Sequence, residues 1–130
     1  MLVVDASTAV AVSLHSKGFA RFGAEELVAP PMLWPEVRSV LHEMQWRGQL
    51  TRDVAKASLE AFHAASIDQR NPRGLGQRAW RIADDFGWAK TYDAEYVALA
   101  ELIGCRLVTL DGRLRRATAR LGFVVALDDL

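Results

Sequence analysis

The stretch Leu2-Val3-Val4-Asp5-Ala6-Ser7-Thr8 decides the fold class of this chain. Its three apolar residues are typical of a short buried strand, and the small polar residues after Asp5 begin a segment with helical character through Leu14. The same order of apolar run, turn and helical segment recurs along the chain. Short strands that alternate with helices indicate an α/β protein, with a mostly parallel sheet covered by helices on both faces.

The remaining elements are expected to alternate in the same way. Further strands are predicted at Leu27–Ala29, Cys105–Leu110 and Phe123–Val125, and residues 67–73 are predicted to form a loop or a short strand. Helices are predicted from about Leu33 to Gly48, from a Thr51 N-cap to about Ser66, from about Leu75 to Phe86, from Thr91 or Tyr92 to Ile103, and over an Arg-rich segment ending near Gly122.

The composition favours an ordinary folded protein. A length of 130 residues favours one domain spanning 1–130, and 51% hydrophobic with 25% charged residues excludes a disordered chain. The 16 Lys and Arg cancel the 16 Asp and Glu, so the net charge points to no nucleic acid, membrane or charged partner. Cys105 has no disulfide partner, and neither a signal peptide nor a membrane-spanning run is evident. We therefore expect a cytoplasmic protein.

Acidic residues stand at the ends of two predicted strands. Asp5 follows the first strand and Asp111 follows the strand at 105–110. Ligands of parallel sheets bind beyond the carboxyl ends of the strands. Two carboxylates at one such edge would repel each other unless a cation lies between them, and oxygen ligands suit a hard divalent metal ion.

Two more acids point toward the same edge. Asp93 shares its helix face with an expected apolar stripe that includes Tyr96 and Val97, and Glu36 lies one turn before Val40. Taken singly, Asp111 reads as a turn former or N-cap, Asp93 as a first-turn stabiliser and Glu36 as a capping residue. Only the set of four favours one acidic pocket.

Four segments resemble a known family in order and spacing. They are Val4-Asp5-Ala6-Ser7, Pro35-Glu36-Val37, Tyr92-Asp93-Ala94-Glu95-Tyr96-Val97-Ala98-Leu99-Ala100 and Leu107-Val108-Thr109-Leu110-Asp111. This pattern is similar to the acidic motifs of PIN-domain ribonucleases, above all the VapC-type toxins of bacterial toxin–antitoxin pairs. The resemblance covers essentially the whole chain.

The resemblance implies a three-layer α/β/α domain that cuts RNA with Mg²⁺ or Mn²⁺ and a metal-activated water. Asp5, Asp93 and Asp111 correspond to metal ligands, and Glu36 corresponds to a ligand or a residue that orients the water. All four would be catalytic. Family members bind a cognate antitoxin in a groove of the early helices and usually form homodimers, so the implied partners are RNA, an antitoxin and a second subunit, with no membrane.

Details of the motifs leave some alternatives open. Ser7 and Thr109 either support the carboxylates by hydrogen bonds or are small residues at crowded strand ends. Some PIN domains carry another acid shortly after the fourth motif, whereas here Arg113 follows Asp111 and Gly112, which puts a second metal ion in doubt.

Basic and aromatic residues supply the candidate RNA surface. The basic residues are 13 Arg and 3 Lys, a bias that suits phosphate recognition. One group surrounds Asp111 and consists of Arg106, Arg113, Arg115, Arg116 and Arg120; a second consists of Arg70, Arg73, Arg78 and Arg81. Solvated helix faces with salt bridges are the alternative. The tryptophans 34, 46, 80 and 88 either stack on unpaired bases or, as we expect first, pack in the core or an interface.

Two other functional classes remain as alternatives. An Asp directly after the first strand also occurs in phosphotransfer enzymes of the haloacid dehalogenase type, which place a second Asp two residues later, where this chain has Ser7. A non-catalytic interaction module that keeps the fold is the other alternative. The residues His15, His42 and His63 have no metal-ligand spacing, and we expect them to lie at the surface or to satisfy local hydrogen bonds.

Overall fold

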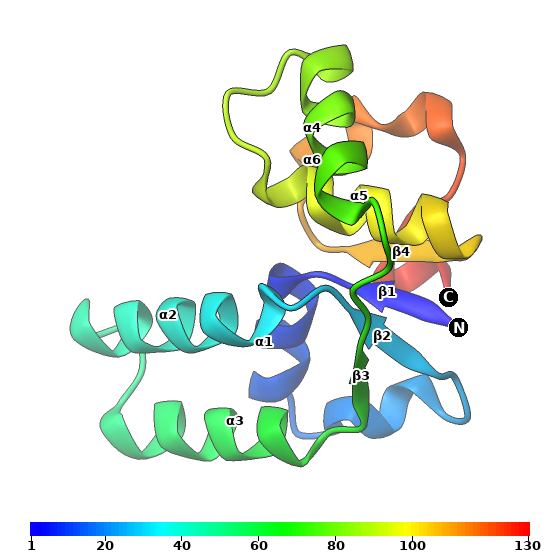
Figure 1. Ribbon diagram of the computed structural model, residues 1–130. Coiled ribbons are helices and arrows are strands. Elements are labelled where there is room, and N and C mark those ends of the chain that lie inside the picture. The colour runs from blue at the N-terminus through cyan, green and yellow to red at the C-terminus, as the bar shows by residue number, and fades with distance from the viewer.

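The computed structural model describes residues 1–130 as a five-stranded sheet between two layers of helices (Figure 1). The strands are β1 (Leu2–Val4), β2 (Leu27–Ala29), β3 (Ile67–Gln69), β4 (Arg106–Thr109) and β5 (Val124–Ala126). Their order across the sheet is β3-β2-β1-β4-β5, and all neighbours pair in parallel. The predicted parallel sheet is confirmed, and residues 67–69 form the short strand rather than the loop.

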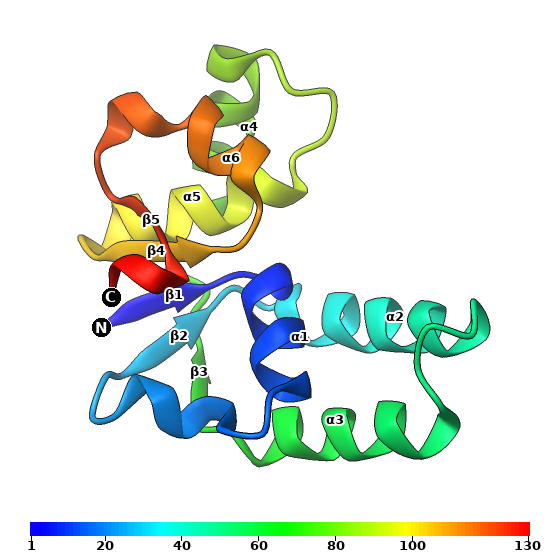
Figure 2. The same ribbon diagram turned by 180° about the vertical axis from the view of Figure 1, so that it is seen from behind.

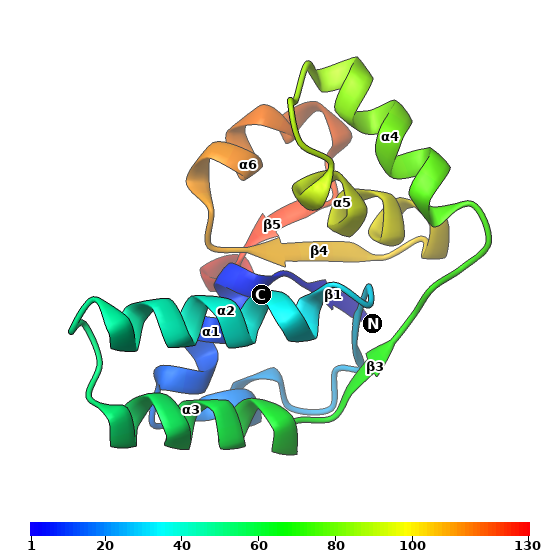
Figure 3. The same cartoon turned by 60° about the vertical axis from the view of Figure 1, so that its left-hand side comes forward.

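Helices cover both faces of the sheet, as expected. Figures 1 and 2 place α1 (Ala6–Leu14), α2 (Leu33–Trp46) and α3 (Arg52–Ala64) on one side, and α4 (Leu75–Phe86), α5 (Tyr92–Ile103) and α6 (Gly112–Ala117) on the other. Short 3₁₀ turns occupy Gly18–Phe22, Ala119–Leu121 and Leu127–Asp129. Helices α2 and α3 form an antiparallel pair that projects beyond the sheet (Figure 3). None of the helices has the length and apolar character needed to cross a membrane.

The Arg-rich helix predicted to end near Gly122 is broken in two. Helix α6 ends at Ala117, and a 3₁₀ turn follows at Ala119–Leu121. Thr118 lies between them, fully buried, and its hydroxyl donates a hydrogen bond of 2.7 Å to the carbonyl oxygen of Leu114. A threonine hydroxyl bonded to the carbonyl four residues back disturbs helical geometry, which explains the break.

The centre of the sheet forms the core. The residues of β1, β2 and β4 other than Arg106 are buried, whereas β5 is half-buried and β3 is largely exposed. Strands covered on both faces need apolar residues at successive positions, because alternate side chains point to opposite faces. This requirement accounts for the runs Leu2-Val3-Val4 and Leu107-Val108.

The register of β1 against β4 positions the candidate site. Val4 lies opposite Val108, so the residues after both strands emerge at the same sheet edge. The hydroxyl of Thr8 in α1 donates a hydrogen bond of 3.1 Å to the carbonyl oxygen of Val108. The strand order reverses at this β1/β4 pair, and ligand sites of open parallel sheets form at such a reversal.

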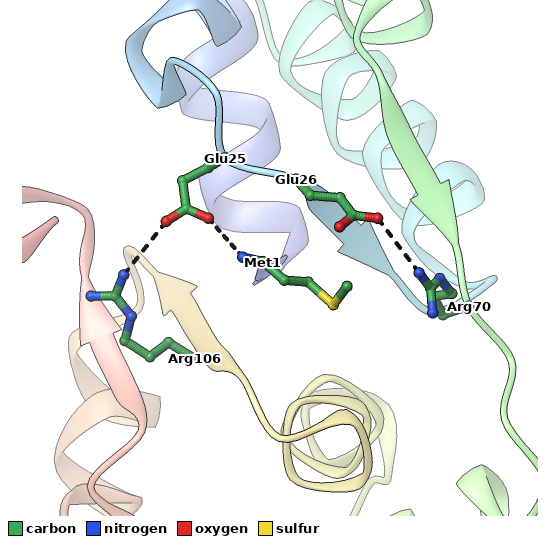
Figure 4. Close-up of polar contacts among 5 residues, drawn as sticks. All are labelled: Met1, Glu25, Glu26, Arg70 and Arg106. Atoms are coloured by element: carbon green, nitrogen blue, oxygen red, sulfur yellow. Dashed lines mark hydrogen bonds and ion pairs between the residues drawn. The ribbon is translucent and has the colours of Figure 1, made fainter.

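Ion pairs join residues at or just before the starts of β1, β2 and β4 (Figure 4). The Met1 amino group lies 2.8 Å from Glu25, and Arg106 lies 3.8 Å from the same residue. Arg70, which follows β3, lies 3.6 Å from Glu26, which precedes the neighbouring strand β2. The grouping of Arg106 with the arginines around Asp111 was therefore wrong. Arg106 begins β4, whereas Asp111 follows its end, so the strand separates the two residues.

Candidate active site

The structure brings the four predicted acids together at the carboxyl edge of the sheet. Asp5 follows β1, Glu36 lies in the first turn of α2, Asp93 lies in the first turn of α5, and Asp111 follows β4. All four line one cavity of about 410 Å³. Four helix N-termini meet there, and their positive ends favour anionic groups.

Asp5 is buried and held by three donors. Its side chain is 5% exposed, and Oδ1 accepts hydrogen bonds from the Thr8 N–H (2.9 Å) and the Ser7 hydroxyl (2.8 Å). The Thr109 hydroxyl donates to Oδ2. Burial raises the pKa of the Asp5 carboxyl above its ordinary value, and these hydrogen bonds oppose the rise. Ser7 and Thr109 thus support the Asp5 carboxylate by hydrogen bonds, which was one of the two alternatives for these residues.

Asp111 is both a helix cap and a cavity residue. Its Oδ1 accepts hydrogen bonds from the N–H groups of Arg113 (2.9 Å) and Leu114 (3.2 Å) and so caps α6. The N–H of Asp111 itself donates to the hydroxyl of Thr109 (3.0 Å). Its Oδ2 accepts no hydrogen bond within the chain, so capping leaves one oxygen available to a ligand.

Glu36 is positioned by a residue whose contact the sequence did not predict. The hydroxyl of Tyr96, which is 1% exposed, donates a hydrogen bond of 2.9 Å to Oε1 of Glu36. Desolvation raises the pKa of Glu36, the charges of Asp93 and Asp5 raise it further, and the Tyr96 hydrogen bond opposes them. The sequence did offer one sign that Tyr96 lies near the acids, because Tyr96 follows Asp93 by one turn on the same helix face.

Asp93 is exposed at the mouth of the cavity. Desolvation and the negative charges of Asp111 and Asp5 raise the pKa of the Asp93 carboxyl, whereas the positive charge of Arg113 lowers it. The acids are therefore close enough to influence one another. None of the four forms an ion pair with a basic side chain.

The donor set fits a hard divalent cation in its chemistry. Four uncompensated carboxylates present oxygen atoms to one cavity, and a divalent cation relieves their repulsion. No three His, Cys, Asp or Glu side chains converge closely enough to hold an ion directly in this arrangement. The three histidines are exposed and lie outside the cavity, as predicted.

A second cavity lies against the same acids. It has a volume of about 480 Å³ and shares Glu36, Asp93 and Asp111 with the first. The two cavities differ in their other lining residues. The first adds Val10, Leu14, Val40 and Met44, whereas the second adds Trp88, Lys90, Tyr92 and Arg113. The acids thus lie between an apolar cavity and one that adds aromatic and basic side chains to them.

The tryptophans divide into two classes. Trp34 packs on Phe62 with ring centroids 6.3 Å apart, and Trp88 stacks on Phe86 at 5.1 Å. Trp46 and Trp80 are 80% and 67% exposed, so these two do not pack in the core, and their place in an interface stays a prediction.

The sequence is similar to known proteins along most of its length. The family model described as PIN domain matches residues 2–119. The chain is 37% identical to ribonuclease VapC9 of Mycobacterium tuberculosis over 116 residues, which are 88% of each chain. It is 34% identical to ribonuclease VapC3 of the same species over 121 residues, covering 89% of this chain and 86% of that relative.

Two solved structures share the fold. PAE2754 from Pyrobaculum aerophilum superimposes with a TM-score of 0.78 at 24% identity, over 98% of this chain and 90% of that one. A toxin–antitoxin complex from Klebsiella pneumoniae superimposes with a TM-score of 0.59 at 16% identity, over 96% of both chains.

Proposed function

Because the chain belongs to the PIN-domain family, we propose that it is a metal-dependent endoribonuclease, the toxin of a type II toxin–antitoxin pair. The relatives that carry the name ribonuclease VapC support this proposal. The observation that carries it is the meeting of Asp5, Glu36, Asp93 and Asp111 around one cavity without a basic partner.

The four acids have different roles in this proposal. Asp5, Asp93 and Asp111 would hold the ion, and Glu36 would be a further ligand or the residue that orients water. Bound Mg²⁺ or Mn²⁺ supplies Lewis-acid chemistry, lowering the pKa of water and neutralising charge on a phosphodiester. The Tyr96 hydrogen bond leaves Oε2 of Glu36 free, and this oxygen would accept a hydrogen bond from the attacking water. Ser7, Thr8 and Thr109 hold Asp5 in one orientation.

The apolar cavity suits the antitoxin. Val10, Leu14, Val40 and Met44 line it beside the acids, and an apolar segment seated there covers the carboxylates. The toxin–antitoxin complex with the same fold supports an antitoxin partner. The apolar cavity is lined by residues of α1 and α2, as is expected for the groove of early helices that the family resemblance implies.

A phosphotransfer mechanism through Asp5 has less support. Enzymes of the haloacid dehalogenase type place a second Asp two residues after the first, whereas this chain has Ser7 there, and the Ser7 hydroxyl donates a hydrogen bond to Asp5. Mass spectrometry after incubation with acetyl phosphate is expected to find no phosphate on Asp5.

The test is neutralisation of one carboxylate. Asp93→Asn and Asp5→Asn are expected to lower cleavage of single-stranded RNA in Mg²⁺ or Mn²⁺ by at least about a hundredfold. Circular dichroism should remain that of the wild type. Asp84→Asn is the matched control, because Asp84 is an exposed acid on α4 outside the site. Wild-type cleavage by Asp93→Asn, with the same metal dependence, would contradict the assignment.

A further inference from the structure

We propose that the cavity lined by Trp88, Lys90, Tyr92 and Arg113 binds an unpaired nucleotide next to the phosphodiester that is cut. This inference rests on the proposed ribonuclease function and adds to it the place where the substrate lies. It names the residues that would hold a base and a phosphate.

The cavity is continuous with the acids. Its lining includes Glu36, Asp93 and Asp111. Tyr92 directly precedes Asp93 in the chain, and adjacent Cα atoms are about 3.8 Å apart. Arg113 follows Asp111 by two residues in the first turn of α6. A nucleotide held by these neighbours therefore adjoins a phosphate at the carboxylates.

Tyr92 presents a free aromatic face. It is 60% exposed, and its hydroxyl forms no hydrogen bond within the chain. An exposed aromatic ring beside Lys90 and Arg113 can stack on a base whose own face is free. Bases inside a duplex are already stacked on their neighbours, so the ring selects an unpaired base. Trp88 stacks on Phe86 and forms a fixed wall of the cavity.

Lys90 and Arg113 supply unpaired positive charge. Both are exposed, and neither forms an ion pair with a carboxylate. Arg113 lies in the first turn of α6, two residues after Asp111, and a guanidinium can bind two phosphate oxygens at once.

The opposite cavity lacks these features. No Lys or Arg lines it, and Val10, Leu14, Val40 and Met44 provide its apolar surface. A phosphate backbone therefore gains no ion pair there. RNA and an apolar partner segment thus approach the same carboxylates from different sides.

Steady-state cleavage of a single-stranded RNA oligonucleotide tests the subsite. Tyr92→Ala and Arg113→Ala are each expected to raise KM about tenfold, because the stacking or the phosphate contact is lost. Tyr92→Phe keeps the ring and should stay within about twofold of wild type. Arg106→Ala is the matched control for charge, because it removes an arginine paired with Glu25 at the far end of β4.

Binding is measured separately from cleavage. With Asp93→Asn as the parent, fluorescence anisotropy of the same labelled RNA should give a Kd about tenfold higher when Tyr92→Ala is added. A duplex of the same sequence should bind equally to both proteins, because its bases cannot reach the ring. Equal Kd values on single-stranded RNA would overturn the proposal.

An abasic substrate locates the base. An abasic ribose is moved one position at a time along the RNA, and one position next to the cut is expected to lose about tenfold in kcat/KM. When the abasic ribose stands at that position, Tyr92→Ala should lower kcat/KM no further. At every other position, Tyr92→Ala should lower kcat/KM as it does on the intact RNA. Losses that multiply at every position would overturn the subsite while leaving the ribonuclease function intact. A wild-type protein that cuts no RNA in Mg²⁺ or Mn²⁺ would overturn both.

Discussion

The hydroxyl of Thr109 donates a hydrogen bond to Oδ2 of Asp5 across a sequence separation of 104 residues. The same Thr109 oxygen accepts a hydrogen bond of 3.0 Å from the N–H of Asp111. One fully buried side chain therefore joins the acids that follow β1 and β4. It orients one carboxylate and places the backbone of the other.

Replacement of the Thr109 hydroxyl tests its role in holding Asp5 and Asp111. Thr109→Val keeps the shape of the side chain but leaves the Asp111 N–H without its partner and removes one donor to Asp5. Loss of a buried hydrogen-bond partner costs about 1–3 kcal/mol, so chemical denaturation should show a lower free energy of unfolding. RNA cleavage should fall about tenfold or more. Thr109→Ser keeps the hydroxyl and should recover most of both. Equal activity of the Val and Ser variants would contradict the role.

Tyr96→Phe tests the positioning of Glu36. The variant keeps the buried ring but removes the hydroxyl that donates to Glu36 Oε1 at 2.9 Å. Hydrogen bonds to charged groups contribute about 1.5–3 kcal/mol, so we expect cleavage to fall roughly tenfold to a hundredfold.

The pH profile distinguishes positioning from packing. The Tyr96 hydrogen bond lowers the pKa of Glu36, so its loss should move the acidic limb of the pH–rate profile to higher pH. Tyr92→Phe is the control, because the Tyr92 hydroxyl forms no hydrogen bond. An unchanged acidic limb in Tyr96→Phe would contradict this role.

The uncompensated acids should make the metal-free protein sensitive to pH. Burial raises the pKa of Asp5, and desolvation together with neighbouring acids raises the pKa values of Glu36 and Asp93. The pKa of such a carboxyl is higher in the folded chain than in the unfolded chain, where it has its ordinary value, 3.8 for Asp93. The free energy of unfolding is therefore fully present below this ordinary pKa, and part of it is lost as the pH rises through the pKa of the folded state.

Asp93→Asn isolates this effect. In EDTA at pH 7 the variant is expected to unfold at a higher temperature than the wild type, and the difference should shrink toward pH 4, where the carboxyl is increasingly protonated. Added Mg²⁺ should stabilise the wild type more than the variant. A wild type more stable than Asp93→Asn in EDTA at pH 7 would contradict the prediction.

Arg78 shows that part of the second arginine group is structural. Its guanidinium donates two hydrogen bonds from α4 to Glu101 on α5, at 3.1 and 2.5 Å. Both side chains are about one-third exposed, at 29% and 35%, so Arg78→Ala should cost only about 1 kcal/mol of unfolding free energy. Cleavage at 25 °C should be unchanged. Arg81→Ala, which removes an unpaired arginine of the same helix, should leave the unfolding temperature as it is.

Local patterns accounted for most secondary structure. Strand β1 and helix α4 lie where they were predicted, and the acids Asp5 and Asp111 follow their strands. These features depend on residues within a few positions of one another, such as an apolar run, a capping side chain or a glycine. The break at Thr118 was missed because it depends on burial of that residue as well as on its type.

Contacts between distant segments required the tertiary structure. Each strand is a short apolar run, and such a run does not specify its neighbour in the sheet. The placement of β1 beside β4 brings Thr109 to Asp5. The first turns of α2 and α5 come from opposite faces of the sheet and meet at its carboxyl edge, which brings Tyr96 to Glu36, 60 residues away.

The zero net charge illustrates the same division. The sequence alone determined that 16 acids balance 16 bases and that four acids fall at strand ends or in first helical turns. Only the tertiary structure decided that Arg106 pairs with Glu25 at the far edge, whereas Lys90 and Arg113 stand unpaired beside the acids. Net charge is a sum over the chain, but a binding surface depends on where each charge lies, and the order of the strands decides that position.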